Sequence, residues 1–141
     1  MLAIARLALI PLLLAALPAW AACQLSLDAV NFGVIDTRKL ELSNGRVRVD
    51  CDTPTSFAVG ISGNNNGRKM RGPDGAEMDY QLYPNATYSR PWGDADSSGD
   101  VVQAQSDGSA PVDLTIYGLI PPQNFIIPGE YRDQPMVTLS F

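Results

Sequence analysis

The chain has 141 residues, of which 45% are apolar and 18% charged, and its formal net charge at pH 7 is −5. It contains no histidine, which excludes catalysis by a histidine base and a histidine-containing zinc site. Ten basic residues against fifteen acidic ones argue against a nucleic-acid partner.

The first 21 residues are predicted to be a secretory signal peptide. Apart from Arg6 and two prolines they are all apolar, and Ala19-Trp20-Ala21 matches a cleavage site. A transmembrane helix is the first alternative, which the short length and the prolines disfavour. A lipoprotein leader ending at Cys23 is the second, which the bulky Trp20 disfavours. We therefore expect a signal peptide over residues 1–21 and an exported domain over residues 22–141.

The exported part contains two cysteines, Cys23 and Cys51. In an oxidising compartment such a pair forms a disulfide more often than it stays as two free thiols. A bridge across 28 residues stabilises a fold by roughly 3.5 kcal/mol on the chain-entropy model. We expect the disulfide, with two buried thiols as the alternative.

Beyond the leader, apolar and polar residues alternate in short runs that turn residues separate. No stretch repeats apolar residues with helical spacing over three turns. Alternation of this kind is typical of strands with one buried and one solvent-facing side. The runs expected to form strands are 46–49 after an Asn44-Gly45 turn, 57–61, 78–82, 114–117 and 136–141. Five to seven such strands predict an all-β fold, an immunoglobulin-like antiparallel β-sandwich.

The last predicted strand, residues 136–141, alternates most strongly and extends to the final residue. A sandwich of this type usually ends with an edge strand and a tail, so an apolar face is expected to stay uncovered here. An open edge promotes aggregation unless another chain covers it. Addition of a strand from another chain is a known way to cover such an edge.

Several motifs occur in a family-specific order. They are Cys23, Asn31-Phe32-Gly33, Val49-Asp50-Cys51, Arg71, Met78-Asp79-Tyr80-Gln81-Leu82-Tyr83, Trp92-Gly93-Asp94, Ile116-Tyr117-Gly118-Leu119-Ile120-Pro121-Pro122-Gln123 and Pro128-Gly129-Glu130-Tyr131-Arg132-Asp133. In these motifs and their spacing the chain resembles the spore coat protein U domain, which also builds archaic chaperone–usher pili. The resemblance covers residues 23–141. Leu119 departs from the pattern, because the family often has Arg there, and the difference is expected to affect a loop contact rather than the fold.

The resemblance implies a sandwich that lacks its last strand. A periplasmic chaperone would lend a strand beside the terminal strand. At the outer-membrane usher, the N-terminal extension of the next pilin subunit would replace this chaperone strand. Val137, Leu139 and Phe141 would line the open groove, and the backbone from Met136 to Phe141 would form the pairing edge. No bond is made or broken, so the chain is expected to be no enzyme and to need no cofactor.

The same resemblance implies a route and a role. The protein would cross the periplasm and reach the cell surface as part of a fimbrium or coat, with roles in cell adhesion and biofilm formation. A shaft subunit donates an N-terminal extension, but only Ala22 would precede Cys23 after cleavage. The chain is therefore expected at a fibre tip or end.

Other residue patterns point to weaker alternatives. The run from Asp94 to Asp100 matches the start of a calcium loop, but Gln105 occupies the position that requires a bidentate Glu. Asp94 and Asp96 are the only candidates for acid–base hydrolysis. A secreted adhesive or carbohydrate-binding module is the main alternative function; it would need exposed aromatic rings, for which the candidates are Tyr80, Tyr83, Tyr88 and Trp92, each also consistent with a core position.

Overall fold

The computed structural model describes residues 23–124 and 126–141, and the predicted signal peptide lies outside them. The described residues form two antiparallel sheets, one with strand order β1-β2-β7-β5-β4 and one with strand order β6-β3-β8. The predicted all-β sandwich is confirmed, with more strands than the five to seven expected. The elements are β1 (Cys23–Asp28), β2 (Glu41–Cys51), β3 (Thr55–Ile61), β4 (Arg68–Arg71), the 3-10 turn η1 (Pro73–Gly75), β5 (Glu77–Tyr83), β6 (Val102–Ser106), β7 (Val112–Ile120) and β8 (Val137–Ser140).

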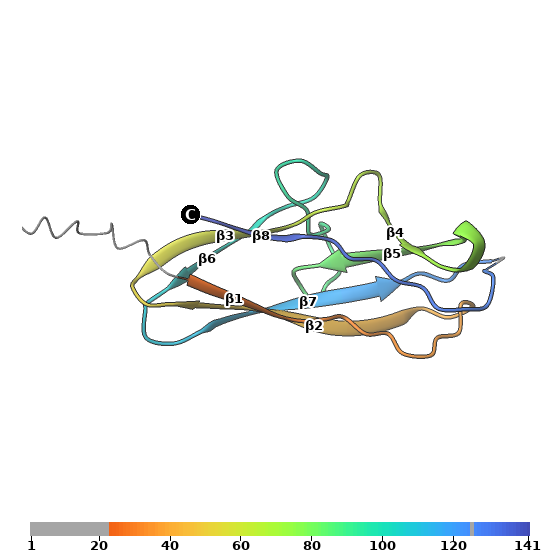
Figure 1. The fold of residues 1–141 in the computed structure, drawn as a ribbon, viewed down its shortest axis with the longest axis horizontal. Coiled ribbons are helices and arrows are strands. Elements are labelled where there is room, and N and C mark those ends of the chain that lie inside the picture. Colours follow the sequence, from red (N-terminus) through yellow and green to blue (C-terminus); the bar gives the residue numbers. More distant parts are fainter. Residues whose placement is uncertain (1–22, 125) are drawn as a thin grey trace, which may run out of the picture.

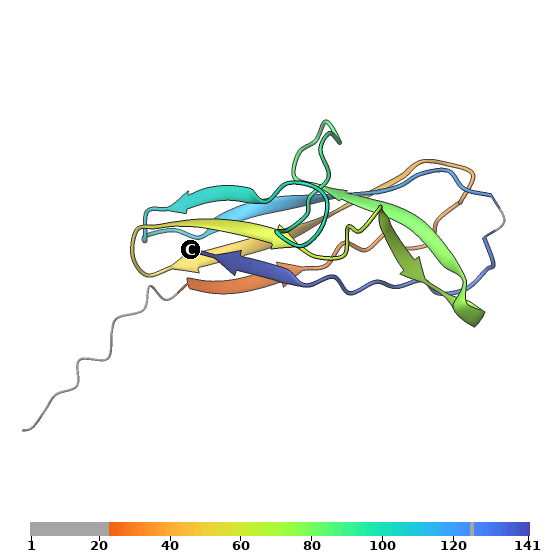
Figure 2. The same ribbon diagram turned by 90° about the horizontal axis from the view of Figure 1, so that it is seen from above.

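The two sheets lie in two layers, with β3, β6 and β8 in one and β1, β2 and β7 in the other (Figure 1). The view turned by 90° shows β8 and β1 along the same long edge of the sandwich, one in each layer (Figure 2). Each of these two strands is also the last strand of its own sheet on that side. Within the described part of the chain, no helix is long and apolar enough to span a membrane.

An apolar core fills the space between the layers. It follows from the alternation along the strands, because every second side chain of a strand faces inward. Val47 and Val49 of β2 and Val59 and Ile61 of β3 are at most 1% exposed. Arg46, which precedes Val47 in β2, is exposed.

A disulfide joins the first two strands. Cys23 in β1 lies directly opposite Cys51 in β2, and the two residues form the predicted bridge. The bridge therefore attaches the edge strand β1 to the neighbouring strand β2.

The turn predicted at Asn44-Gly45 was wrong, because both residues lie inside β2. A Cβ atom on Gly45 would lie 2.5 Å from the backbone oxygen of Asp28 and 2.8 Å from Cγ2 of Val30. The glycine is needed for the close approach of the segment that follows β1. Gly118 in β7 serves the same purpose, since its Cβ would lie 2.7 Å from Val30 and 2.8 Å from Phe32.

Candidate functional site

The terminal strand β8 packs on the core but leaves it partly uncovered. In the register of the sheet, Val137 lies opposite Ile61 and Leu139 opposite Val59. The β3 residues of these two pairs are 1% and 0% exposed, whereas Val137 and Leu139 are only half-buried. On its β3 side, β8 has a neighbouring strand. On its other side, no described strand covers the inward-facing side chains of β8.

Strand β1 shows the same imbalance in the other layer. Leu25 lies opposite Val49 and Leu27 opposite Val47, so both leucines share the inward face of these valines. Both valines are fully buried, but Leu25 is 37% exposed and Leu27 is 51% exposed. Inward-facing leucines with this much exposure indicate that no strand covers them.

These four inward-facing residues of the two edge strands, Leu25, Leu27, Val137 and Leu139, are called the edge groove below. They lie on the strands that border the same long edge of the sandwich (Figure 2). Open apolar edges are rare in stable soluble sandwiches, because they pair with other chains.

The free backbone edge of β8 can be assigned by residue. The N–H of Met136 donates to Ser62 Oγ at 2.7 Å, and the carbonyl of Met136 accepts from the N–H of Ser62 at 2.9 Å. The backbone groups of successive strand residues point to opposite edges of the strand. The N–H and C=O groups of Val137 and Leu139 therefore point away from β3.

The side chains of the two other predicted site residues, Met136 from the pairing edge and Phe141 from the groove, lie elsewhere. The side chain of Met136 is 70% exposed, because alternation places it on the outer face with Thr138. Phe141 is 72% exposed and borders an open hollow of about 470 Å³ that is lined by residues of the three-stranded sheet, among them Ala58 and Ser140. Neither side chain packs on the core.

The opposite edge of β3 is closed by the segment that precedes β6. The indole N–H of Trp92 donates to the Val59 carbonyl at 2.9 Å, and the N–H of Ile61 donates to the carbonyl of Gly93 at 2.9 Å. Trp92 is fully buried. Near Ile61 the edge of β3 that faces away from β8 is therefore paired, whereas the outer edge of β8 has no partner strand among the described residues.

A buried arginine connects the layers at the end of β3. Arg68 in β4 is 1% exposed, and its guanidinium donates to the carbonyls of Ile61 at 2.9 Å, Trp92 at 2.6 Å and Ser62. Its Nε donates to Gln81 Oε1 at 3.2 Å. Burial lowers the pKa of this guanidinium from its ordinary value. Ser62, which Arg68 holds, is the residue that pairs with Met136 at the start of β8.

The segment between β7 and β8 contacts both β5 and the far edge strand β4 of the five-stranded sheet. The side chain of Gln123 accepts from the N–H of Asp79 at 2.8 Å and donates to the Asp79 carbonyl at 2.7 Å. The backbone of Arg132 pairs with that of Arg71 in β4. Tyr80 donates its hydroxyl to Asp133, and burial together with this carboxylate raises the pKa of Tyr80 well above its usual range.

The catalytic and metal alternatives gain no support from the geometry. Asp94 Oδ1 accepts from Asp96 N at 3.0 Å and from Ser97 Oγ at 2.8 Å, so this carboxylate shapes its own loop. Asp100 pairs with Arg90 at 2.7 Å. No group of three or more potential ligands is placed to hold a metal ion in residues 23–124 and 126–141.

The aromatic candidates fall into two groups. Trp92 and Tyr80 are core residues, 0% and 7% exposed. Tyr83 and Tyr88 are only half-buried, and they cluster with Tyr117, which was not among the four aromatic candidates.

Comparison with known proteins bears on both the family and the fold. The family model for the Spore Coat Protein U domain matches residues 10–138. Among solved structures, the chain is similar to the CsuC–CsuE chaperone–tip adhesion subunit pre-assembly complex from archaic chaperone–usher Csu pili of Acinetobacter baumannii, with a TM-score of 0.61 and 20% identity. The similarity covers 86% of this chain and 40% of that one. No curated protein sequence matches the chain.

Proposed function

Because the chain belongs to the Spore Coat Protein U domain family, we propose that it is an exported structural subunit of a chaperone–usher type pilus or surface coat. In this proposal it is assembled by donor-strand complementation, in which another chain supplies the missing strand. The observation that carries the proposal is the edge groove, where inward-facing side chains and a free backbone edge lie side by side. The similarity in fold to a chain of a chaperone–subunit complex supports it.

The edge groove specifies the chemistry of its occupant. Leu25, Leu27, Val137 and Leu139 present apolar surface, so the incoming strand must carry an apolar residue at every second position. The free N–H and C=O groups of Val137 and Leu139 provide the ladder for its backbone. A strand from a periplasmic chaperone fits this description, and so does the extension of a neighbouring pilin subunit delivered at an outer-membrane usher.

The energy available for this step follows from the exposed surface. Full burial of a Leu or Val side chain stabilises by about 1.5–3 kcal/mol. Because the four groove residues are already partly buried, covering all of them contributes about half of that each, or roughly 3–6 kcal/mol in total. Backbone hydrogen bonds add about 0.5–1.5 kcal/mol each. Folding energy of this size sustains assembly without a chemical reaction.

Two parts of the proposal concern residues outside the described structure. Export depends on the predicted leader at residues 1–21, and the position at a fibre tip depends on what precedes Cys23 in the exported protein. Both stay predictions, and N-terminal sequencing of the exported protein tests them together.

The decisive experiment fuses a donor strand behind Phe141 through a short flexible linker. A peptide with apolar residues at alternate positions is expected to raise the Tm of the exported domain by about 10 °C or more, since each kcal/mol corresponds to roughly 3–6 °C at this size. The matched control carries Ser or Thr at the same positions. Without a donor strand, the domain is expected to aggregate or to require a co-expressed chaperone.

Two substitutions in β8 test the assigned face. Leu139→Glu places a charge in the edge groove and is expected to abolish stabilisation by the donor strand, whereas Thr138→Glu on the outer face is expected to preserve it. An equal response of both variants, or a monomeric domain of high Tm that no donor strand stabilises further, would contradict the proposal.

A further inference from the structure

The outer face of the five-stranded sheet carries three tyrosines in contact. Tyr83 in β5 lies directly opposite Tyr117 in β7, and both face outward because their neighbours Leu82 and Ile116 face the core. The ring of Tyr88, from the loop after β5, stands edge-on to both, with centroid distances of 5.6 Å to Tyr83 and 6.1 Å to Tyr117. These three residues are called the tyrosine patch below.

The hydroxyl groups separate the tyrosine patch from the other tyrosines. Tyr80 donates its hydroxyl to Asp133, and Tyr131 donates its hydroxyl to the carbonyl of Ile127 at 2.5 Å. The three hydroxyls of the tyrosine patch form no hydrogen bond with any residue in the described ranges. Each ring of the patch thus combines an apolar body with a polar group available to a ligand.

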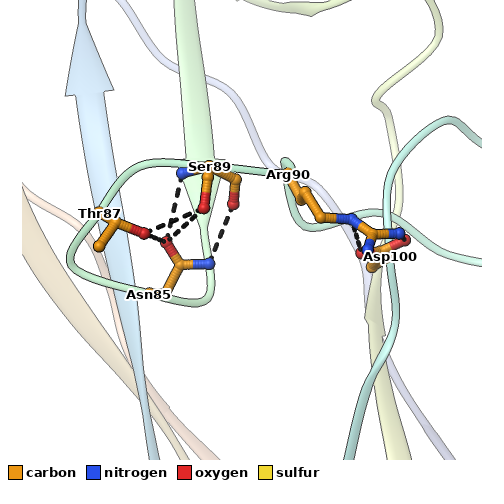
Figure 3. A network of polar contacts seen from close by, with 5 residues as sticks. All are labelled: Asn85, Thr87, Ser89, Arg90 and Asp100. Atoms are coloured by element: carbon orange, nitrogen blue, oxygen red, sulfur yellow. Dashed lines mark hydrogen bonds and ion pairs between the residues drawn. The ribbon is translucent and has the colours of Figure 1, made fainter.

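The loop holds Tyr88 in a strained backbone conformation. Tyr88 has φ = 51° and Arg90 has φ = 57°, a left-handed region that bulky residues rarely adopt. The side chain of Asn85 fixes this shape (Figure 3), since it donates to the Ser89 carbonyl at 2.9 Å and accepts from the hydroxyl of Thr87 at 2.7 Å. Strain of this kind persists only where the surroundings enforce it, and it is frequent at binding sites.

The charges around the tyrosine patch compensate one another. Arg90 forms an ion pair with Asp100, and on the same sheet face Arg48 pairs with Asp113, both at 2.7 Å. Beside Tyr117, the register places the uncharged Asn44. The patch thus presents aromatic rings and neutral hydrogen-bonding groups, without a free cation or carboxylate at its centre.

We propose that the tyrosine patch binds a neutral carbohydrate. Aromatic rings fit the apolar C–H face of a pyranose, and the free hydroxyls fit the hydroxyl groups at its rim. Rigid tyrosines of this kind offer a large contact area at a small cost in conformational entropy. The site lies on the outer sheet face and shares no residue with the edge groove, so the inference goes beyond the proposed assembly function and does not depend on it.

The test is a titration of the purified exported protein with neutral hexasaccharides, namely cellohexaose, xylohexaose and mannohexaose, followed by calorimetry or NMR shifts. At least one is expected to bind, and Tyr88→Ala is expected to weaken this binding about tenfold, since a central aromatic contact is a typical hot spot. Tyr88→Phe, which keeps the ring, is expected to lose only a few-fold. Val34→Ala, fully exposed outside the patch, is the control and should bind normally.

Three outcomes of the binding experiment would overturn the proposal. They are no binding of any neutral hexasaccharide at 10 mM, binding that Tyr88→Ala leaves unchanged, and tighter binding of an acidic oligogalacturonate. If Tyr88→Ala instead dissociates a dimer seen by sedimentation, the patch is a contact between copies and the proposal also fails. Stabilisation of Tyr88→Ala by a fused donor strand is measured in parallel, so failure of this site is distinguishable from failure of the assembly function.

Discussion

Replacement of Arg68 by Met tests how much a single buried cation contributes to holding the two sheets together. The guanidinium donates to the carbonyls of Ile61, Ser62 and Trp92. The first two lie at the end of β3, and Trp92 lies in the segment before β6. Met has a similar length and fills much of the space, so the variant removes the hydrogen bonds with little loss of packing. Ser62 is also the partner of Met136, which makes the start of β8 sensitive to the change.

The magnitude follows from the three acceptors. A buried carbonyl that loses its donor costs about 1–3 kcal/mol. Three of them would cost about 3–9 kcal/mol, but removing the guanidinium also removes the cost of keeping a cation out of water, which amounts to several kcal/mol. A net loss of about 2–5 kcal/mol is therefore expected, or a Tm lower by roughly 6–30 °C for a domain of this size.

The assay is chemical and thermal unfolding of the donor-strand-fused protein, with Lys69→Met as the matched control. Lys69 is the next residue in β4, but its side chain is half exposed and pairs with the exposed Asp79, so its loss is expected to cost less than about 1 kcal/mol. A result within 1 kcal/mol of wild type for Arg68→Met, or equal losses in the two variants, would refute the reasoning.

Two further predictions concern Tyr80 and Gly45. In the folded state the pKa of Tyr80 is raised above the value of about 10 that applies in the unfolded chain, so the folded protein keeps this proton at higher pH. The free energy of unfolding is therefore expected to fall as the pH rises above 10, and Tyr80→Phe should flatten this slope in unfolding measurements. Gly45→Ala is expected to destabilise the fold by about 1–3 kcal/mol, because its Cβ would lie 2.5 Å from the backbone oxygen of Asp28. The control is Asn44→Ala, one residue away on the exposed face, which should change the free energy of unfolding by less than about 0.5 kcal/mol.

Much of the fold could be predicted from local patterns. The alternation around Tyr80 and around Ile116 predicted β5 and β7, because a half-buried strand requires apolar residues at every second position. The disulfide and the family were also predicted correctly. Strand β1 carried the same signal in Leu25 and Leu27 but was not among the predicted runs.

The candidate site was only partly predictable. Val137 and Leu139 were expected on the inward face of the last strand, and the structure places them there, whereas Met136 and Phe141 lie outside the core. Their role in accepting a strand stays a prediction. Leu25 and Leu27 of β1 were not predicted to belong to the edge groove, because nothing in the sequence near them shows that β8 lies along the same edge of the sandwich.

The sequence by itself determined five of the eight described strands, β2, β3, β5, β7 and β8, together with the bridge and the family. Each of these depends on residues that are near one another in the chain or on motifs read in order. Only the tertiary structure decided the burial of Arg68, the use of Gly45 and the contact of Tyr88 with Tyr117. The physical reason is the same in each case. The partner groups, whether carbonyls, a backbone oxygen or an aromatic ring, come from segments distant in sequence that meet only when the sheets have formed.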